Sequence, residues 1–220
     1  PIDFLNRIQK VKYRVNPFIV NVAEQLFKCG ISIGKFIPIL EIPLPPKPVD
    51  IAENKEARKG YRRAAAEVMN KNASAFRRSC RTRMTMETVR RFRYKEFFCP
   101  WSFDYRGRAY PIPAFLTPQT DDFGKSLIRF ADESVVTPEA QDWLAFQCAT
   151  TYGLDKSTMN ERLEWVEQNE DLITRIAEDP FSTLSEWEIA EEPWQFLASC
   201  EEYYAVVTKQ TRNTTGLCVA

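Results

Sequence analysis

The chain has 220 residues, 44% of them hydrophobic and 27% charged, which is the composition of an ordinary folded protein and excludes a disordered chain. It contains no histidine, which excludes mechanisms that need an imidazole base and metal sites with histidine ligands. No apolar run approaches the roughly 18–20 residues that cross a bilayer, so we expect no membrane segment.

The 30 basic and 30 acidic residues cancel over the whole chain but not along it. Residues 55–108 carry 16 Lys and Arg against 5 Asp and Glu, whereas residues 109–220 carry 7 against 20. This distribution predicts a basic surface that binds phosphates, attached to an acidic remainder.

The first half of the chain is predicted to hold two long helical segments. Apolar residues recur at three- and four-residue spacing over residues 2–28, and Pro17 should kink that helix or start a new one. Prolines between residues 30 and 50 predict an extended or looped connector. Residues 54–95 then predict a long basic helix, with a break possible near residues 70–72. Its expected apolar stripe consists of Tyr61, Ala65, Val68, Met69, Phe76 and Met84.

The second half begins with two aromatic stretches, FFCPWSF and RAYPIPAF, which predict short strands joined by a turn at DYRG. After Pro118 the pattern is helical again. Thr137 before Pro138 predicts a helix start, and Thr158 with Glu161 predicts a capping box. A last helix should follow Pro193 with its inward residues at Leu197, Cys200, Tyr204 and Val207. The predicted fold class is therefore mostly α with a small β component (α+β).

The six cysteines lie far apart without a CxxC pair, which predicts free thiols in a reducing compartment rather than disulfides or a zinc site. They are Cys29, Cys80, Cys99, Cys148, Cys200 and Cys218.

Seven arginines lie within 17 residues of the basic helix, and the guanidinium fork matches phosphate oxygens well. We favour binding to a phosphate backbone over a solvated helix face, because few acids compensate these charges. The arginines are Arg77, Arg78, Arg81, Arg83, Arg90, Arg91 and Arg93.

The segment Phe103–Pro111, FDYRGRAYP, combines a glycine with two arginines. Gly107 can adopt a positive φ or permit a close backbone approach. On a strand, Arg106 and Arg108 would share one face and reach one phosphate backbone, with Asp104 orienting one of them. A hairpin whose Asp–Arg pair serves only the fold is an equally good interpretation.

Four pairs of adjacent acids could be taken for metal ligands, but neighbouring residues on a helix point about 100° apart. We predict solvated acidic faces for all four, and no complete active site in this chain. The pairs are Asp121–Asp122, Asp132–Glu133, Glu191–Glu192 and Glu201–Glu202.

FDYRGRAYP, continued by PAFLTPQTDDFGKSLIRFAD, resembles the single-subunit, phage-type DNA-directed RNA polymerases, which include the mitochondrial enzymes. Asp104, Gly107 and Arg108 match the DxxGR signature of that family. The resemblance continues through WLAFQCATTYG, ERLEWVEQNEDLI and PWQFLASCEEYYAVV, and upstream through YRRAAAEVMNKN to the first helix, so that it covers nearly the whole chain.

The resemblance implies part of a right-hand polymerase fold, with thumb helices in residues 1–95 and the beginning of the palm in residues 96–220. The resemblance also implies that the DxxGR segment contacts the DNA template and the nascent RNA. Carried over by position, the nucleic-acid-binding residues are Asp104, Arg106, Gly107, Arg108, Tyr110 and Lys125, to which the charge pattern adds Arg77, Arg78 and Arg81.

The chain begins with Pro1 and ends at Ala220, where the family's magnesium-binding aspartate would follow almost immediately, so we expect a fragment. The whole enzyme would make RNA from NTPs with Mg²⁺, whose ligands lie outside this chain, and the fragment alone would be inactive. We expect a monomeric parent enzyme that needs no membrane. We expect it in the cytoplasm of a phage-infected bacterium rather than in a mitochondrion or plastid.

Two other hypotheses remain. The chain could be a stand-alone nucleic-acid-binding module without polymerase activity, or a relative of primases or DNA polymerases, because right-hand folds are shared among these activities. The apparently cut termini favour the polymerase fragment over the module, and the DxxGR context favours it over the primase.

Overall fold

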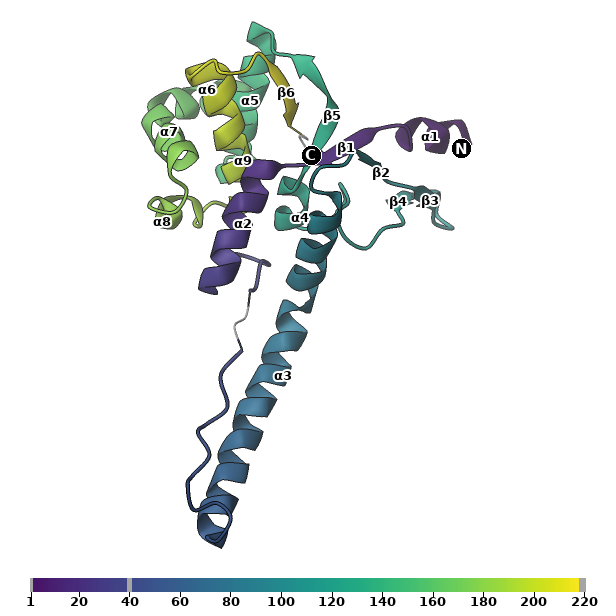
Figure 1. The fold of residues 1–220 in the computed structure, drawn as a ribbon. Helices are drawn as coiled ribbons and strands as arrows, with labels where there is room; N and C mark the ends of the chain where they lie inside the picture. The colour runs from purple at the N-terminus through teal and green to yellow at the C-terminus, as the bar shows by residue number, and fades with distance from the viewer. Residues whose placement is uncertain (1, 39–40, 218–220) are drawn as a thin grey trace.

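The computed structural model describes residues 2–38 and 41–217, which form a compact body and one long projection (Figure 1). We call residues 41–92 the arm and the other described residues the body. The arm consists of an extended connector and helix α3 (Lys55–Phe92). The fold is mixed, with helices predominating over short strands, as predicted.

The chain enters the body through helix α1 (Ile2–Ile8), strand β1 (Lys12–Val15) and helix α2 (Pro17–Cys29). The prediction of a helix across residues 2–28 is therefore wrong at β1, which pairs with a strand from the second half of the chain. Pro17 does start a new helix. The side chain of Asn16 caps that helix by accepting from the backbone N–H of Phe18 at 3.1 Å.

The main sheet has the order β2-β1-β5-β6, and its pairings are antiparallel. Its other strands are β2 (Phe97–Phe98), β5 (Ile128–Val135) and β6 (Thr214–Leu217). Strand β5 lies in a segment predicted to be helical. In the sheet Tyr13 lies opposite Phe130, and their rings stack with centroids 5.7 Å apart. Strand β5 pairs with β1 along one edge and with β6 along the other, and this pairing overrides its local helical pattern.

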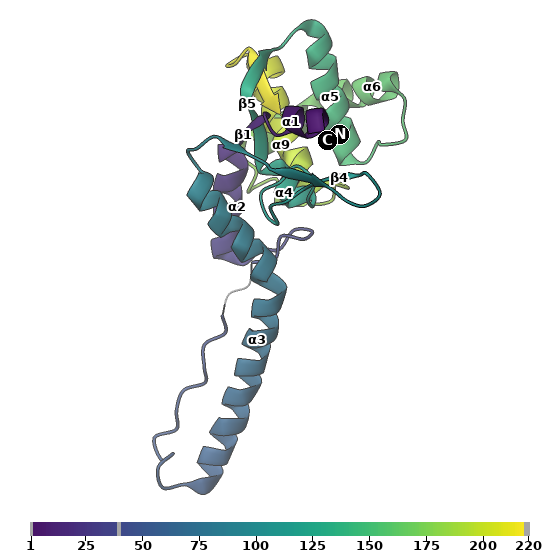
Figure 2. The same cartoon turned by 90° about the vertical axis from the view of Figure 1, so that its right-hand side faces the viewer.

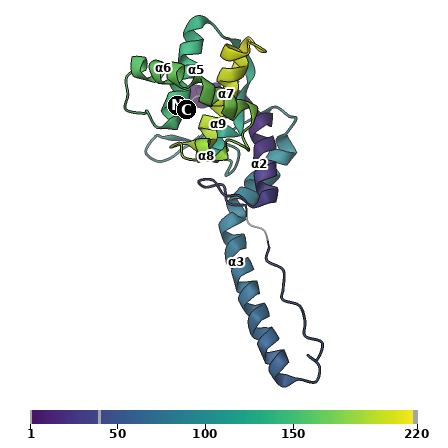
Figure 3. The same ribbon diagram turned by 90° about the vertical axis from the view of Figure 1, so that its left-hand side faces the viewer.

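The predicted hairpin forms a second, two-stranded sheet, β3 (Trp101–Phe103) with β4 (Ala109–Pro111). The second half of the chain adds a cluster of helices to the body (Figure 3). They are α4 (Asp122–Ser126), α5 (Pro138–Tyr152), α6 (Met159–Gln168), α7 (Glu170–Glu178), α8 (Leu184–Trp187) and α9 (Pro193–Tyr203), which continues into a π-helix at Tyr204–Thr208.

Local signals set several helix boundaries as expected. The hydroxyl of Thr137 accepts from the N–H of Ala140 at the start of α5, and Thr158 and Glu161 form the predicted capping box of α6. Helix α9 is buried along almost its full length and packs against α5, α7 and α4. Of the four residues expected to face inward, Leu197 and Cys200 are buried, whereas Tyr204 and Val207 are half-buried in the π-helix.

Helix α3 is uninterrupted over its 38 residues and is about 57 Å long. The connector runs beside it and completes the arm (Figures 1 and 2). The break considered near residues 70–72 does not occur. The connector is fixed by Asn72, whose side chain accepts from the N–H of Ile42 at 3.0 Å and donates to the carbonyl of Ile42 at 2.9 Å.

The predicted apolar stripe of α3 is wrong in part, because Met69, Phe76 and Met84 are about half exposed. The buried row instead contains mostly small residues, which from Ala75 to Val89 recur at three- and four-residue intervals. Near the body, the hydroxyl of Thr82 in this row accepts from the N–H of Ile37 at 3.0 Å. The buried row is Ala65, Ala75, Ser79, Thr82, Thr85, Met86 and Val89.

Within the described residues no helix has the length and apolar character needed to cross a bilayer. The predicted free thiols are confirmed for Cys29, Cys80, Cys99, Cys148 and Cys200, and Cys218 lies outside the described residues.

Candidate nucleic-acid interface

The DxxGR segment forms the tight turn between β3 and β4, which projects where the arm joins the body (Figure 1). One carboxylate oxygen of Asp104 accepts the backbone N–H groups of both Arg106 and Arg108 at 2.9 Å. Gly107 has φ 79°, and a Cβ built there meets nothing within 4 Å. The turn therefore needs glycine for its left-handed backbone rather than for a close approach.

The side chains of this turn point to solvent. Arg106, Gly107 and Arg108 are exposed, Tyr105 is 88% exposed, and Tyr110 is 44% exposed. The expectation that Asp104 orients an arginine through an ion pair is wrong, since its carboxylate is used to order the backbone. The arginines also lie in the turn and not on one face of a strand. The guanidinium of Arg106 instead lies over the ring of Tyr105, 5.1 Å from its centroid.

The seven arginines clustered in residues 77–93 fall into two groups. Arg77 and Arg78 are exposed and form no ion pair with any described residue. The others are occupied by partners within the protein: Arg81 pairs with Asp121 at 3.0 Å, Arg90 and Arg91 pair with Glu87, Arg93 pairs with Glu24, and Arg83 lies over the ring of Phe76. Within residues 77–93 the charge available to a ligand is therefore that of Arg77 and Arg78. Arg62 and Arg63, nearer the start of α3, are also exposed.

Two adjoining hollows link the arm to helix α4. A hollow of about 380 Å³ is lined by Arg81 and Lys35 together with Thr120 and Asp121. A second of about 370 Å³ shares Lys35 and Asp121 and extends to Lys125. Lys35 was not predicted as a site residue. The one sign of it in the sequence is the preceding Gly34, which in the structure has φ 56° and lies in the tight turn between Ile33 and Phe36.

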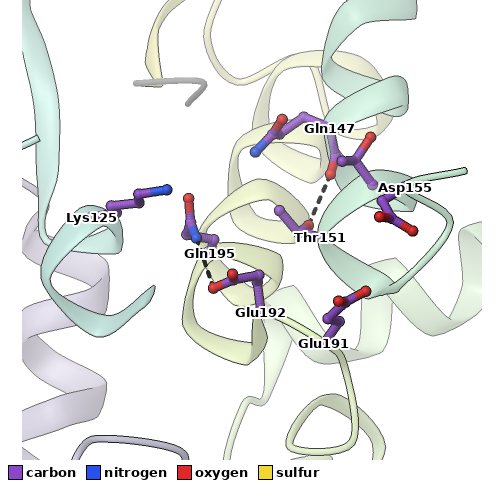
Figure 4. Close-up of a pocket in the computed structure, with 8 residues that line it drawn as sticks. Lys125, Gln147, Thr151, Asp155, Glu191, Glu192 and Gln195 are labelled. Carbon is purple, nitrogen blue, oxygen red and sulfur yellow. Dashed lines mark hydrogen bonds between the residues drawn. The ribbon is translucent and has the colours of Figure 1, made fainter. Parts of the chain in front are cut away.

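Lys125 lies in the last turn of α4 and also lines a third hollow of about 220 Å³ between α4, α5 and α9 (Figure 4). Its ammonium points toward the hollow and has no partner among residues 2–38 and 41–217. The side chains of Gln147 and Gln195 border the middle of the hollow, and Asp155 and Glu191 stand at its far side. No hydrogen bond or ion pair between described residues joins Lys125 to the Asp104 turn.

The prediction of solvated faces is wrong for two of the acid pairs. Asp122 caps helix α9, since its carboxylate accepts from the backbone N–H groups of Trp194 and Gln195, each at 2.9 Å. Burial raises the pKa of Asp122 to about 6, against these hydrogen bonds, which favour the ionised form. Glu202 is 1% exposed.

Within the described parts of the chain, no three carboxylate or thiol side chains lie close enough together to hold a metal ion. The residues present here do not fit a magnesium site of their own, and no catalytic step is assigned to them.

The candidate interface thus combines an exposed basic helix, a projecting arginine turn and a row of cations along the hollows. A sequence profile for a family described as DNA-dependent RNA polymerase matches residues 134–218. Further alignments cover about nine-tenths of the chain. The chain is thus a relative of the single-subunit DNA-directed RNA polymerases, as the DxxGR segment suggested.

Among its relatives is T7 RNA polymerase of Escherichia phage T7, which is 31% identical over 209 residues, covering 92% of this chain and 23% of the phage protein. The mitochondrial DNA-directed RNA polymerase of Neurospora crassa is 28% identical over 92% of this chain and 14% of its own length. A chloroplastic and mitochondrial RNA polymerase of Arabidopsis thaliana is 28% identical over 90% of this chain and 20% of its own length. The chain therefore spans less than a quarter of the relatives it matches.

Proposed function

We propose that this chain is the part of a DNA-directed RNA polymerase that holds the template strand and the RNA–DNA hybrid. The observation that carries the proposal is the arm, a projecting helix with free arginines at Arg77 and Arg78, mounted on an acidic body. The exposed positive charges of such a long basic helix attract a polyanion, and binding one neutralises their mutual repulsion.

In this proposal residues 1–95 are the thumb and residues 96–220 the beginning of the palm. The Asp104 turn presents Arg106, Arg108 and Tyr110 to the template and RNA, and Lys125 with Lys35 holds the backbone beside α4. Phosphate contacts of this kind fix position and carry no sequence information.

The whole protein would be a monomeric nucleotidyltransferase that uses NTPs and Mg²⁺, with the metal ligands outside this chain. We place it in the cytoplasm of a phage-infected bacterium, since relatives from phages T7 and K11 reach 31% identity against 28% for the fungal mitochondrial one. The 220-residue chain by itself would then bind hybrid without making RNA.

The test compares two triple variants of the complete gene product that lose the same charge. One changes Arg77, Arg78 and Arg81 to alanine, and the other changes Lys156, Arg175 and Lys209, which lie on the body. The arm variant should reduce the slope of log affinity against log salt for an RNA–DNA hybrid by nearly one for each lost phosphate contact. The body variant should leave that slope unchanged.

Equal slopes for both variants would mean that the arm does not contact phosphates and would overturn the proposal for α3. A change in Arg108→Ala alone should weaken hybrid binding by about 1–3 kcal/mol if it meets the backbone in a desolvated site. Hybrid binding without any RNA synthesis by the complete gene product would favour the stand-alone binding module instead.

A further inference from the structure

The strand β6 is held against β5 by an irregular ladder. Arg129 lies opposite Leu217 and Ser134 opposite Thr215, so β5 advances five positions while β6 advances two. A ladder that is interrupted in this way leaves three residues of β5 unmatched, and it fixes the register of the short strand weakly.

The interrupted stretch contains Gly216, where the two backbones touch. A Cβ at Gly216 would lie 2.6 Å from the carbonyl oxygen of Phe130 and 3.3 Å from Nε of Arg129. Only glycine fits there, and only when β6 sits in its present register. A slip by one residue would bring Thr215 or Leu217 against that carbonyl.

Side-chain hydrogen bonds hold β6 in the register that the interrupted ladder fixes only weakly. Glu202 on α9 accepts three donors, from Thr215 at 2.7 Å, from Arg212 at 3.0 Å and from Arg129 at 3.5 Å. The hydroxyl of Thr215 in turn accepts the backbone N–H of Leu217 at 3.2 Å. Glu202 is thus connected, through one hydroxyl, to the last described residue of the strand.

A second glutamate, Glu133, accepts hydrogen bonds from Arg129 and from the threonine that precedes Thr215 in β6. The hydroxyl of Thr214 donates to Glu133 at 2.6 Å, and Arg129 donates to the same carboxylate at 3.3 Å. Both threonines of β6 therefore reach a glutamate that shares Arg129. Because β-strand side chains alternate, a one-residue slip would break both contacts together.

The burial of these charges makes the arrangement selective. The side chains of Glu202 and Arg129 are 2% and 8% exposed, and a buried charge that loses a partner is strongly unfavourable. Other registers of β6 leave Glu202 without the Thr215 donor and are therefore penalised. The network discriminates between registers more than it adds net stability.

We propose that Glu202 is a positioning residue that sets the register of β6 through Thr215, and so places the segment that follows β6. This inference rests on the proposed function, in which the metal ligands lie outside this chain, and on the resemblance, which implies that the family's metal-binding aspartate follows shortly after Ala220. Glu202 acts through Thr215 and β6 and touches none of the reacting atoms.

The first measurement is hydrogen exchange of the Leu217 amide in the complete gene product. Thr215→Val removes the hydroxyl at constant volume, and Thr215→Ser keeps it. We expect Thr215→Val and Glu202→Gln to speed exchange at Leu217 by about 10–100-fold. Thr215→Ser should stay within about threefold, as should Glu201→Gln, which changes the neighbouring glutamate but leaves the Glu202–Thr215 contact in place.

The second measurement separates positioning from general stability. Thr215→Val should lower kcat for RNA synthesis by about 10–100-fold, because a displacement near 1 Å has that effect, while hybrid affinity stays within about twofold. Thr215→Ser should restore kcat. A parallel loss of kcat and hybrid affinity would indicate a damaged fold and overturn the positioning role.

Other outcomes are equally decisive. Equal exchange at Leu217 in the valine and serine variants would show that the hydroxyl does not fix β6. Faster exchange with unchanged kcat would show that the register of β6 does not place the following segment. An unaltered gene product that makes no RNA would defeat the proposed function, while the exchange data would still decide how β6 is held.

Discussion

The body and the arm are stabilised by different means. The body has a dense aromatic centre, in which Trp194 is fully buried and lies 4.7 Å from Phe123 and 4.9 Å from Phe36 between ring centroids. The arm buries mainly a row of small side chains, and the connector beside it is largely exposed. Apolar burial therefore stabilises the body, whereas helix propensity and a few hydrogen bonds stabilise the arm.

This difference explains where each kind of residue can be used. Exposed arginines lower the free energy of unfolding little on a helix that depends on few tertiary contacts. The arm can therefore carry unpaired charge for a ligand. In the body the same charges are neutralised inside networks, as with Arg129 and Glu202. We expect mutations in the body to change the free energy of unfolding, and mutations in the arm to change binding or local order.

The largest effect on stability should come from Trp194→Ala. It removes a fully buried ring that also donates from its indole to the carbonyl of Ile33 at 3.3 Å, and it should lower the free energy of unfolding by about 3–5 kcal/mol. Urea denaturation followed by circular dichroism measures the change. The control is Trp143→Ala, 54% exposed, which should cost about 1 kcal/mol or less.

The next largest effect concerns pH and Asp122. Its pKa is raised to about 6 from an ordinary value of 3.8, so this group stabilises the fold fully below about pH 4, and the contribution is lost as the pH rises through 6. Relative to Asp122→Asn, the unaltered protein should lose up to about 3 kcal/mol of stability between these pH values. Denaturant midpoints across that range measure the difference.

Glu161→Gln is the matched control of opposite sign. The backbone N–H of Thr158 donates to Glu161 and lowers its pKa, so the stability from Glu161 is present above its ordinary value of 4.5 and is lost as the pH falls. If the difference between the unaltered protein and Asp122→Asn were independent of pH, burial would not control the ionisation of Asp122.

The elements that could be predicted from the sequence are those with local causes. The Asp104 turn, the Thr158 capping box and helix α3 depend on residues a few positions apart. Strands β1 and β5 could not be predicted, because each becomes a strand only through pairing with a distant segment. Their local spacing fits a helix equally well.

The same distinction applies to the candidate site. Four arginines could be named as candidates because they stand in conspicuous basic motifs, and the structure shows that all four are exposed. They are Arg106, Arg108, Arg77 and Arg78. Asp122 was missed because Trp194 and Gln195 lie more than 70 residues away in the sequence. Glu202 was missed although Thr215 and Arg212 are 13 and 10 residues away, because its buried partner Arg129 is 73 residues away. Adjacent acids alone give no sign of which one turns inward.

The smallest effect should come from Asn72→Ala in the arm. It removes both hydrogen bonds that clasp Ile42 to α3, which should cost about 1–2 kcal/mol locally. Since the connector is attached to the helix at few points, the change should appear as faster hydrogen exchange at Ile42 and faster proteolysis of residues 41–54, with the urea midpoint of the body unchanged. Asn70→Ala is the matched control, because Asn70 is exposed on the same helix and makes no hydrogen bond to a described residue. A shift of the body's midpoint with Asn72→Ala would mean that arm and body unfold as one unit, and the contrast between them would not hold.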